Sequence, residues 1–416
     1  MNRIVLIGNG FDLAHGLKTS YADFINWYWD QRLYNIIMLR EAISADLLCS
    51  LIILPNSGYK NWYLFSYQNS FFKDIIKNEW RVSGKEFIEE LKNNSNYFEI
   101  KYSPFFERII KSIETKGWVD IENEYYNLLT EYTVKDYSEN NITSLNKQLQ
   151  YLQERLTDYL ILINQQEVAV NSSIKKKIYS PIRSEEVSIE ATKVVKDYVD
   201  WWLGQQQITW EQKLYSYGIT GINNSDHIYE IEKYKKNPEY YTDYPSTFML
   251  PDIIMLLSFN YTKTAQQYLM KDKHNFVLNY IHGKVDDPRS VIFGYGDEID
   301  DNYKRLQKLN NNECLSNIKT IKYQESVNYR SILSVIESAP YQVCVMGHSC
   351  GNSDRTLLNT LFEHKNCISI KPYYYKKNDG TDNYLELVQN ISRNFTDMKL
   401  MRDRVVNKTY CETLTD

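Results

Sequence analysis

A glycine-rich segment close to the N-terminus combines residue types and spacing that could bind a phosphate. It contains Gly8, Asn9, Gly10, Phe11, Asp12 and Gly16. In an open parallel sheet, a turn between a strand and a helix binds phosphates, because glycine lets the backbone approach and N–H groups at the helix start face the anion. The dinucleotide fingerprint G-x-G-x-x-G is broken at Leu13, which disfavours an ordinary dehydrogenase. A tight turn without a ligand is the alternative interpretation.

An amide side chain, Asn260, ends the apolar run 253–259, which we expect to form a buried strand. Ligands of parallel sheets bind outside the carboxyl ends of the strands. An Asn amide in that position can hold a sugar hydroxyl or a water molecule. The alternative is a helix cap, with Asn260 or Thr262 at the start of an expected helix over 263–271.

His282 occupies a similar place, at the end of the expected strand 276–281. Histidine changes charge readily near neutral pH and therefore suits a general base, although a lone histidine is more often structural. A second G-x-G turn, with Gly294 and Gly296, follows a shorter expected strand over 290–293.

One more turn lies between the expected strand 341–346 and an expected helix near 354–363. It contains Gly347, His348, Ser349, Cys350, Gly351 and Asp354. The glycines favour an anion or a nucleotide, while Asp354 could simply cap the helix. A Ser–His hydrolase is disfavoured because the G-x-S-x-G motif is absent. A Cys350 nucleophile fits poorly because nothing indicates a depressed pKa.

The elements that must position these turns are strands separated by helical stretches, which is the pattern of βαβ units and a parallel sheet. We therefore expect an α/β fold with a Rossmann-like parallel sheet. Residues 1–20 and 247–416 would form its nucleotide-binding core, and 21–246 a large, mostly helical, Tyr-rich insertion. Expected helices of the insertion span 22–42, 70–93, 104–116, 120–134, 145–163 and 190–203. Residues 204–246 are expected to be irregular, and Thr143 or Ser144 to cap the helix 145–163.

A pocket is predicted where the turns converge, at one edge of the sheet. Two carboxylates of the insertion, Asp120 and Glu122, could reach this pocket. The favoured interpretation is local: Asp120 caps a helix, and Glu122 stabilises the first turn of that helix.

The composition limits the class of function. The 416 residues include 48 basic and 53 acidic side chains, a net charge of −5 that disfavours nucleic acid as a partner. A nuclease is disfavoured for the same reason and because no cluster of metal-binding carboxylates is evident. Six scattered Cys, none in a CxxC pair, indicate reduced thiols and a cytoplasmic protein. No segment has the length and apolar character of a signal peptide or a membrane helix.

Together the motifs resemble the bacteriophage abortive infection AbiH family. The resemblance rests on five segments that span the chain, residues 8–17, 259–262, 281–283, 293–296 and 347–355. The insertion between them cannot be matched residue by residue. The resemblance implies an antiphage defence effector.

The AbiH pattern is in turn similar, more distantly, to sirtuin-like folds, which in bacterial immunity often hydrolyse NAD. This resemblance implies that Asn260 positions the nicotinamide ribose or the attacking water and that His282 is the catalytic base. Protein deacylation is disfavoured, because the zinc-binding cysteine pairs of deacylating sirtuins are missing and no metal is expected. Thr262 also departs from the sirtuin pattern, which has Asp there, so a different nucleotide or a degenerate pocket stays open.

The leading hypothesis is therefore an effector that cleaves the N-glycosidic bond of NAD or a related nucleotide. Asp12 is a candidate carboxylate to stabilise the oxocarbenium-like state that forms. The alternative is a non-enzymatic sensor that binds a nucleotide and acts through protein contacts of the helical insertion. A phage or host protein as trigger, and assembly into a homo-oligomer, are further expectations.

Overall fold

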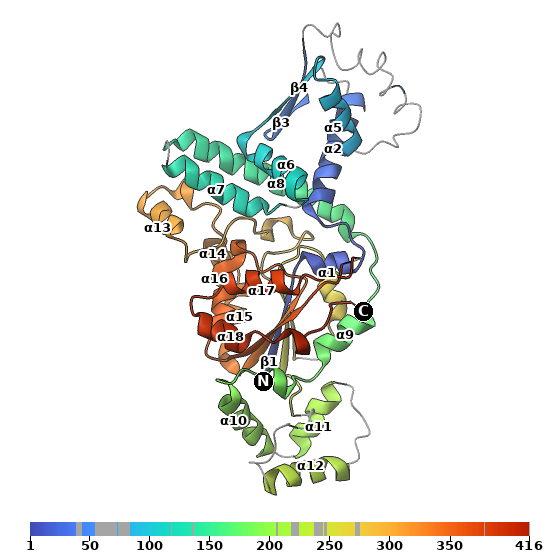
Figure 1. Ribbon diagram of the computed structural model, residues 1–416, viewed down its shortest axis with the longest axis vertical. Helices are drawn as coiled ribbons and strands as arrows, with labels where there is room; N and C mark the ends of the chain where they lie inside the picture. Colours follow the sequence, from blue (N-terminus) through green and yellow to red (C-terminus); the bar gives the residue numbers. More distant parts are fainter. Residues whose placement is uncertain are drawn as a thin grey trace.

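The apolar run near the N-terminus forms β1 (Asn2–Ile7), the central strand of a five-stranded parallel sheet. All six residues of β1 are buried, as is usual for a parallel strand covered on both faces. The other strands are β5 (Ile253–Ser258), β6 (Phe276–Tyr280), β7 (Tyr341–Met346) and β8 (Cys367–Tyr373). The sheet lies in the middle of the molecule, in the order β6-β5-β1-β7-β8 (Figure 1). The expected α/β fold with a parallel sheet is confirmed.

The computed structural model describes residues 1–38, 44–54, 73, 84–117, 119–134, 137–204, 207–217, 224–236, 244, 248–270, 275–377 and 379–415. The chain order across the sheet reverses beside β1. From β1 the chain passes to β5 and β6 on one side, then crosses to β7 and β8 on the other. The carboxyl ends of β1 and β7 are therefore neighbours at the point of reversal, where open α/β sheets bind their ligands.

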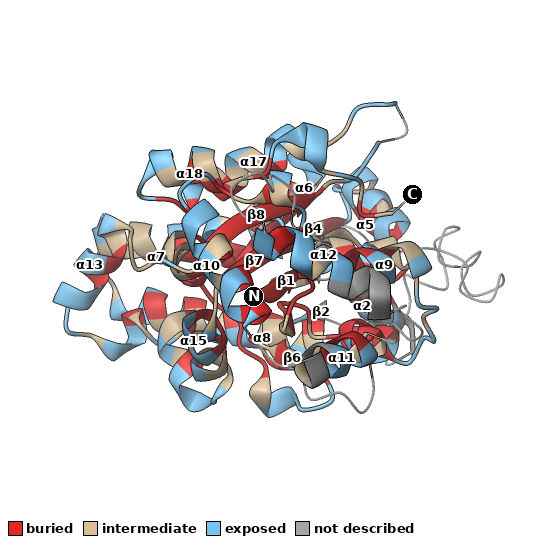
Figure 2. Ribbon diagram, turned by 90° about the horizontal axis from the view of Figure 1, so that it is seen from below, coloured by how far each residue is buried: buried red, intermediate tan, exposed pale blue. Residues whose placement is uncertain are grey.

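Alternate residues of β1 enter two different cores, because successive side chains of a strand point to opposite faces. Helices that surround the sheet or follow its strands are α1 (Asn9–Ala14), α9 (Ser172–Tyr179), α13 (Asp301–Lys308), α14 (Lys319–Lys322), α15 (Asn328–Ser338), α16 (Arg355–Glu363), α17 (Tyr384–Arg393) and α18 (Met398–Arg404). Ile4 and Leu6 pack with α15 to α18, and Val5 and Ile7 pack with α9. Figure 2 shows buried residues concentrated along β1, β7 and β8.

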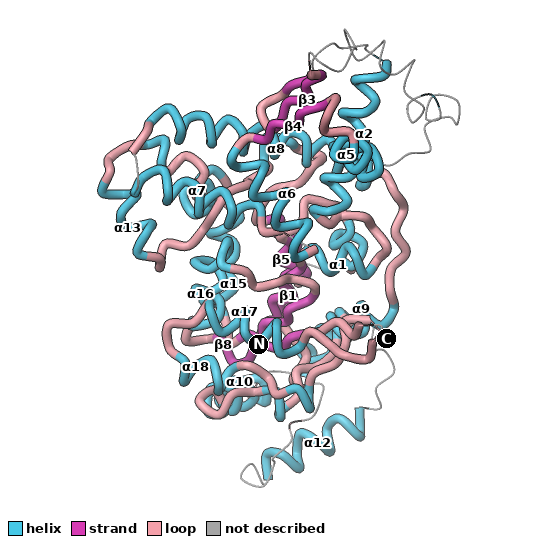
Figure 3. Tube along the Cα trace, turned by 45° about the horizontal axis from the view of Figure 1, so that its top comes forward, coloured by secondary structure: helices cyan, strands magenta, loops and turns pink. Residues whose placement is uncertain are grey.

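The first part of the predicted insertion forms a core beyond the carboxyl edge of the sheet, together with Leu17 and with buried residues of the segment 285–314 (Figures 1 and 3). Its elements are α2 (Tyr21–Met38), β2 (Ser44–Ala45), β3 (Cys49–Ile53), α5 (Gly84–Asn93), β4 (Phe98–Tyr102), α6 (Pro104–Lys116), α7 (Ile121–Val134) and α8 (Glu139–Asn164). Strands β2, β3 and β4 form an antiparallel sheet that the helical pattern did not predict. The expected cap of α8 is wrong, because the helix starts earlier and Ser138 accepts the N–H of Asn141.

The later part of the insertion lies at the opposite end of the sheet. Its helices are α10 (Thr192–Leu203), α11 (Gln207–Ser216) and α12 (Asn224–Lys236), and the core that they help to form includes Met1 and Ile368. Helices α11 and α12 correct the expectation that 204–246 is irregular. The helices of 21–246 thus form two groups with α9 between them (Figure 1). The division into one core and one insertion stays a prediction.

Other expected elements differ from the structure near the carboxyl edge. Residues 290–293 do not form a strand. They belong to an irregular segment, in which the Ile292 N–H donates to the His282 carbonyl at 2.9 Å. The expected helix 263–271 is only a short 3-10 helix, and neither Asn260 nor Thr262 caps it. The first part of the expected helix 70–93 falls largely outside the described residues. Short 3-10 helices span Ser184–Glu186, Thr264–Tyr268, Pro288–Ser290, Asn312–Cys314, Tyr323–Glu325, Asn352–Asp354 and Lys408–Tyr410.

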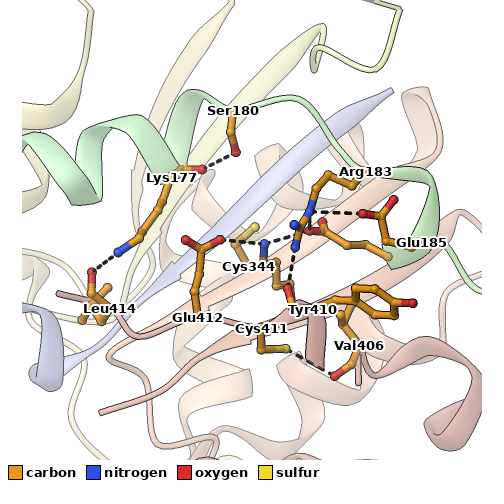
Figure 4. Close-up of polar contacts among 12 residues, drawn as sticks. Lys177, Ser180, Arg183, Glu185, Cys344, Val406, Tyr410, Cys411, Glu412 and Leu414 are labelled. Atoms are coloured by element: carbon orange, nitrogen blue, oxygen red, sulfur yellow. Dashed lines mark hydrogen bonds and ion pairs between the residues drawn. The ribbon is translucent and has the colours of Figure 1, made fainter. Parts of the chain in front are cut away.

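An ionic network, buried at Lys371 and Glu186, ties the C-terminal segment to the sheet (Figure 4). Lys371 of β8 contacts Glu186 at 2.8 Å and Glu412 at 3.1 Å. Arg183 pairs with the same Glu186 and donates to the Tyr410 carbonyl at 2.6 Å. The network therefore anchors the end of the chain against the last strand. Within the described part of the chain, no helix is long and apolar enough to span a membrane.

Candidate functional site

Three side chains from separate turns meet beyond the carboxyl edge of the sheet. His282 follows β6, His348 follows β7, and Asp354 ends the 3-10 helix before α16. His282 Nε2 lies 3.2 Å from Asp354 Oδ1, and His348 Nε2 lies 3.5 Å from Asp354 Oδ2. All three residues are buried, with 4%, 6% and 7% of their surfaces exposed in that order. The structure thus brings three of the predicted site residues into contact.

Two more residues complete a buried charge cluster that consists of His282, His348, Asp354, Lys319 and Glu122. Lys319 opens α14 and is fully buried. Its Nζ lies 2.8 Å from Asp354 Oδ1 and 2.8 Å from Glu122 Oε2. Glu122 lies in the first turn of α7, and its Oε1 accepts the N–H of Gly294 at 3.1 Å. The cluster therefore joins the insertion to the parallel sheet.

The local interpretation of the two insertion carboxylates is confirmed for Asp120 and incomplete for Glu122. Asp120 Oδ1 accepts the N–H of Asn123 at 3.0 Å and so caps α7. Glu122, two residues later, reaches Lys319 instead of serving its own helix alone. Sequence reasoning missed Lys319, because it is one of 48 basic residues and no motif surrounds it.

Burial and ion pairing shift the pKa values of the cluster residues in different directions. Burial opposes the charge of Lys319, but Asp354 and Glu122 outweigh it and raise the lysine pKa. Burial alone would raise the pKa of Asp354, yet Lys319 and His282 hold that pKa well below its usual range. Burial raises the pKa of Glu122 to about 7, against the effect of Lys319. Lys319 thus forms ion pairs with two carboxylates, and Glu122 is the one that is more easily protonated.

Hydrogen bonds set the proton positions of the two histidines. The Cys350 N–H donates to His348 Nδ1 at 3.0 Å, so a neutral His348 carries its proton on Nε2, which faces Asp354. Cys350 has a φ of 54°, a left-handed conformation that costs a non-glycine residue about 1–2 kcal/mol. His282 Nε2 also lies 3.2 Å from the Tyr323 hydroxyl, and no described residue hydrogen-bonds its Nδ1. Nδ1 is therefore the nitrogen of His282 that is left to accept a proton.

The surroundings of His282 keep its imidazole neutral. Burial and the charge of Lys319 lower the His282 pKa to about 4, although Asp354 acts in the opposite direction. The rings of Phe259 and Tyr323 pack against the imidazole, with centroids 5.2 Å and 6.2 Å away. A neutral histidine in such a shielded place can act as a general base.

The lowered pKa predicts that acid destabilises the fold through His282. Between pH 6.5 and about 4 the unfolded histidine binds a proton that the folded one does not, so stability falls as the pH falls through this window. The expected loss from this residue between pH 7 and pH 5 is roughly 2 kcal/mol. Urea unfolding at both pH values should show a smaller loss in His282→Asn than in the wild type. An equal loss in the two proteins would show that His282 does not cause this pH dependence.

The other two residues predicted to be catalytic, Asp12 of α1 and Asn260 after β5, lie in a separate polar group. Asp12 Oδ2 accepts the hydroxyl of Thr262 at 2.6 Å, while its buried Oδ1 has no partner among the described residues. Burial raises the Asp12 pKa. Asn260 Nδ2 donates to the Gly8 carbonyl at 2.9 Å and so ties the end of β5 to the first turn. In the described part of the chain, no hydrogen bond or ion pair joins Asp12 to His282.

The first glycine turn packs backbone against backbone on the turn after β7. The N–H groups of Gly8 and Gly10 donate to the carbonyls of Met346 and Gly347, at 3.3 Å and 2.8 Å. A Cβ on Gly8 would lie 2.4 Å from His348 Cα, and one on Gly347 only 2.1 Å from the nitrogen of Phe11. Close packing of the two turns therefore explains why glycine occupies these positions. Phosphate binding by the turn stays a prediction.

The remaining predicted binding residues have mixed surroundings. Asn9, the first residue of α1, and Gly16, which follows the helix, are exposed, and Gly16 has a positive φ of 78°. Gly294 leaves no room for a Cβ, which would lie 2.1 Å from the Asn317 carbonyl oxygen, and it serves the cluster through its N–H to Glu122. Gly296 faces the Ser353 carbonyl. Ser349 is exposed, and its carbonyl accepts the Asn390 amide at 2.9 Å.

The described residues contain no group of three or more His, Cys, Asp or Glu side chains arranged to hold a metal ion. The expectation that the protein uses no metal stays a prediction. What the cluster does provide is acid–base chemistry: a neutral histidine, a charged carboxylate, and a second carboxylate that protonates easily.

Comparison with known proteins adds one match. The family model for bacteriophage abortive infection AbiH covers residues 4–375 of the 416-residue chain. Neither a curated protein nor a solved structure matches the chain. The match takes in both the parallel sheet and the charge cluster, so it concerns the whole architecture and not one motif. The chain therefore belongs to the bacteriophage abortive infection AbiH family.

Proposed function

We propose that the chain is an antiphage effector that hydrolyses the N-glycosidic bond of NAD or a related nucleotide. Family membership supports the part in abortive infection. The observation that carries the enzymatic part is the contact of His282 Nε2 with Asp354 Oδ1 at 3.2 Å. It leaves Nδ1 of a neutral, buried imidazole to take a proton, at the sheet edge where parallel sheets bind ligands.

In the proposed reaction, His282 accepts a proton at Nδ1 from a ribose hydroxyl or from the attacking water. Asp354 stabilises the imidazolium that forms. The electron pair of the breaking bond moves to the nicotinamide nitrogen, so nicotinamide leaves as a neutral ring and the ribose becomes oxocarbenium-like. A carboxylate near the ribose stabilises that charge, and Asp12 is the candidate, with Asn260 orienting the sugar.

The strand order supports the nucleotide part of the proposal. Numbered along the chain, the five parallel strands have the order 3-2-1-4-5, which matches the first five strands of dinucleotide-binding sheets. The Rossmann-like and sirtuin-like assignments rest on this order and on the motifs. Because the N–H groups of Gly8 and Gly10 are already used, phosphates would bind through other groups of the turns. The six free cysteines support a cytoplasmic location.

The decisive test is the release of nicotinamide from NAD by the purified protein, alone and with phage lysate. His282→Ala should lower the rate by about 100-fold or more, because a general base contributes at least this factor. His364→Ala removes the same ring from a half-buried place at the end of α16 and should keep the wild-type rate. The proposal fails if the wild type releases no nicotinamide while a known hydrolase works in the same buffer, or if His282→Ala keeps full activity.

A sensor without enzymatic activity is the second candidate function. It is favoured by exposed aromatic side chains on the helices at the far end of the sheet, where Trp201 is 56%, Tyr215 70% and Tyr229 64% exposed. Aromatic residues are enriched in protein interfaces. A phage or host protein that binds there would be the trigger, and a second copy of the chain the alternative partner. Phage protection that survives His282→Ala but not Trp201→Ala would favour this candidate.

A further inference from the structure

One buried lysine connects the proposed base to the inserted helix α7. Lys319 Nζ lies 2.8 Å from Asp354 Oδ1 and 2.8 Å from Glu122 Oε2. Asp354 Oδ1 is also the oxygen that lies 3.2 Å from His282 Nε2. Lys319 and His282 therefore share one carboxylate oxygen, and Glu122 contacts the lysine from its other side.

Glu122 is itself held by both parts of the molecule. Its second oxygen accepts the N–H of Gly294, at 3.1 Å, from the segment that follows β6. Gly294 has a φ of 156° and no room for a side chain beside the Asn317 carbonyl, so this N–H has a fixed position. Asp120, two residues before Glu122, starts the helix at the same place by capping it. The first turn of α7 is thus held in contact with the segments that follow β6.

The contacts are electrostatic as well as geometric. The charge of Lys319 disfavours the imidazolium form of His282, and the charge of Asp354 favours it. Removal of Glu122 would leave the positive charge of Lys319 to Asp354 alone. The charged or titratable groups that face His282 are Asp354, Lys319, His348 and Tyr323, with Glu122 and Tyr261 next to them.

We propose that Lys319 is a positioning residue for His282, on which it acts through the shared Asp354 oxygen, and that Glu122 holds Lys319 in place. This inference rests on the proposed function, in which His282 is the base. The contact of helix α7 with Lys319, through Glu122, then completes the site. The insertion thus contributes to catalysis and not only to partner binding. A partner that moved α7 would change the basicity of His282.

The test is a titration of the six histidine rings of the full chain by nitrogen-15 NMR, together with the pH profile of nicotinamide release. In Lys319→Met, the His282 titration midpoint should rise by roughly one pH unit, because the opposing charge is gone. Lys319→Arg keeps the positive charge, so its His282 midpoint should stay close to the wild-type value. The acid limb of the rate profile should move with the midpoint in Lys319→Met and stay in place in Lys319→Arg.

Lys322→Met is the matched control, since Lys322 lies one turn later in α14 and contacts Asn317 at 3.2 Å. It should leave the His282 midpoint unchanged. A His282 midpoint that is the same in Lys319→Met as in the wild type overturns the proposal. If that variant does not fold, an unchanged midpoint in Lys319→Gln, which keeps a hydrogen-bond donor without the charge, overturns it. If the wild type releases no nicotinamide while the midpoint still rises in the uncharged Lys319 variant, the proposed function fails and the positioning role stands.

Discussion

Gly347→Ala is expected to lower the free energy of unfolding by roughly 3–5 kcal/mol, through backbone strain together with overpacking. Gly347 has a φ of 76°, a left-handed conformation that an alanine adopts only with strain. Its added Cβ would also lie 2.1 Å from the nitrogen of Phe11 and 2.6 Å from the carbonyl carbon of Gly10. These are backbone atoms, which cannot move without separating the two turns. Urea unfolding followed by circular dichroism measures the loss.

Gly16→Ala is the matched control for this prediction. Gly16 has nearly the same φ, 78°, but nothing lies within 4 Å of the place where its Cβ would be. Its substitution should therefore cost only the strain, about 1–2 kcal/mol. Equal losses in the two variants would show that the close approach of the two turns contributes nothing. That result would also return the glycines of the first turn to their predicted ligand role.

Asp354→Asn is expected to destabilise the protein by roughly 3 kcal/mol and to stop nicotinamide release. Asp354 is the common partner of Lys319, His282 and His348. Removal of one member of a buried ion pair costs about 3–5 kcal/mol, and the lower end applies because Lys319 keeps Glu122. The imidazolium that forms on His282 would lose its stabilising charge as well. Urea unfolding and the NAD assay measure the two effects.

Asp301→Asn is the control for the loss of a carboxylate charge. Asp301 is exposed and, among the described residues, forms an ion pair only with Lys304 of its own helix, at 2.9 Å, so the unfolding midpoint should not change. If Asp354→Asn unfolds at the wild-type urea concentration, the cluster contributes no net stability. If it keeps full activity, Asp354 has no part in the proposed reaction.

Much of the sheet could be predicted from local patterns. Short apolar runs that end at glycine or at a polar residue mark β1, β5, β6 and β7, and the helical stretches between them require parallel neighbours. The failures lie where local preference was weak. The segment 290–293 is apolar, but its backbone groups bond to single partners instead of a neighbouring strand. Residues 204–246 were too polar and Tyr-rich to predict α11 and α12.

By itself, the sequence determined that His282, His348 and Asp354 lie at one edge, because the carboxyl ends of parallel strands share an edge. Only the tertiary structure decided which side chains touch. Glu122 and Lys319 are 197 positions apart, and no local pattern links a first-turn carboxylate to a lysine in another segment. The same holds for the glycine turns after β1 and β7, which were predicted to bind a ligand and which pack against each other in the structure. Residue types specify strands and turns locally, whereas contacts depend on how distant segments pack.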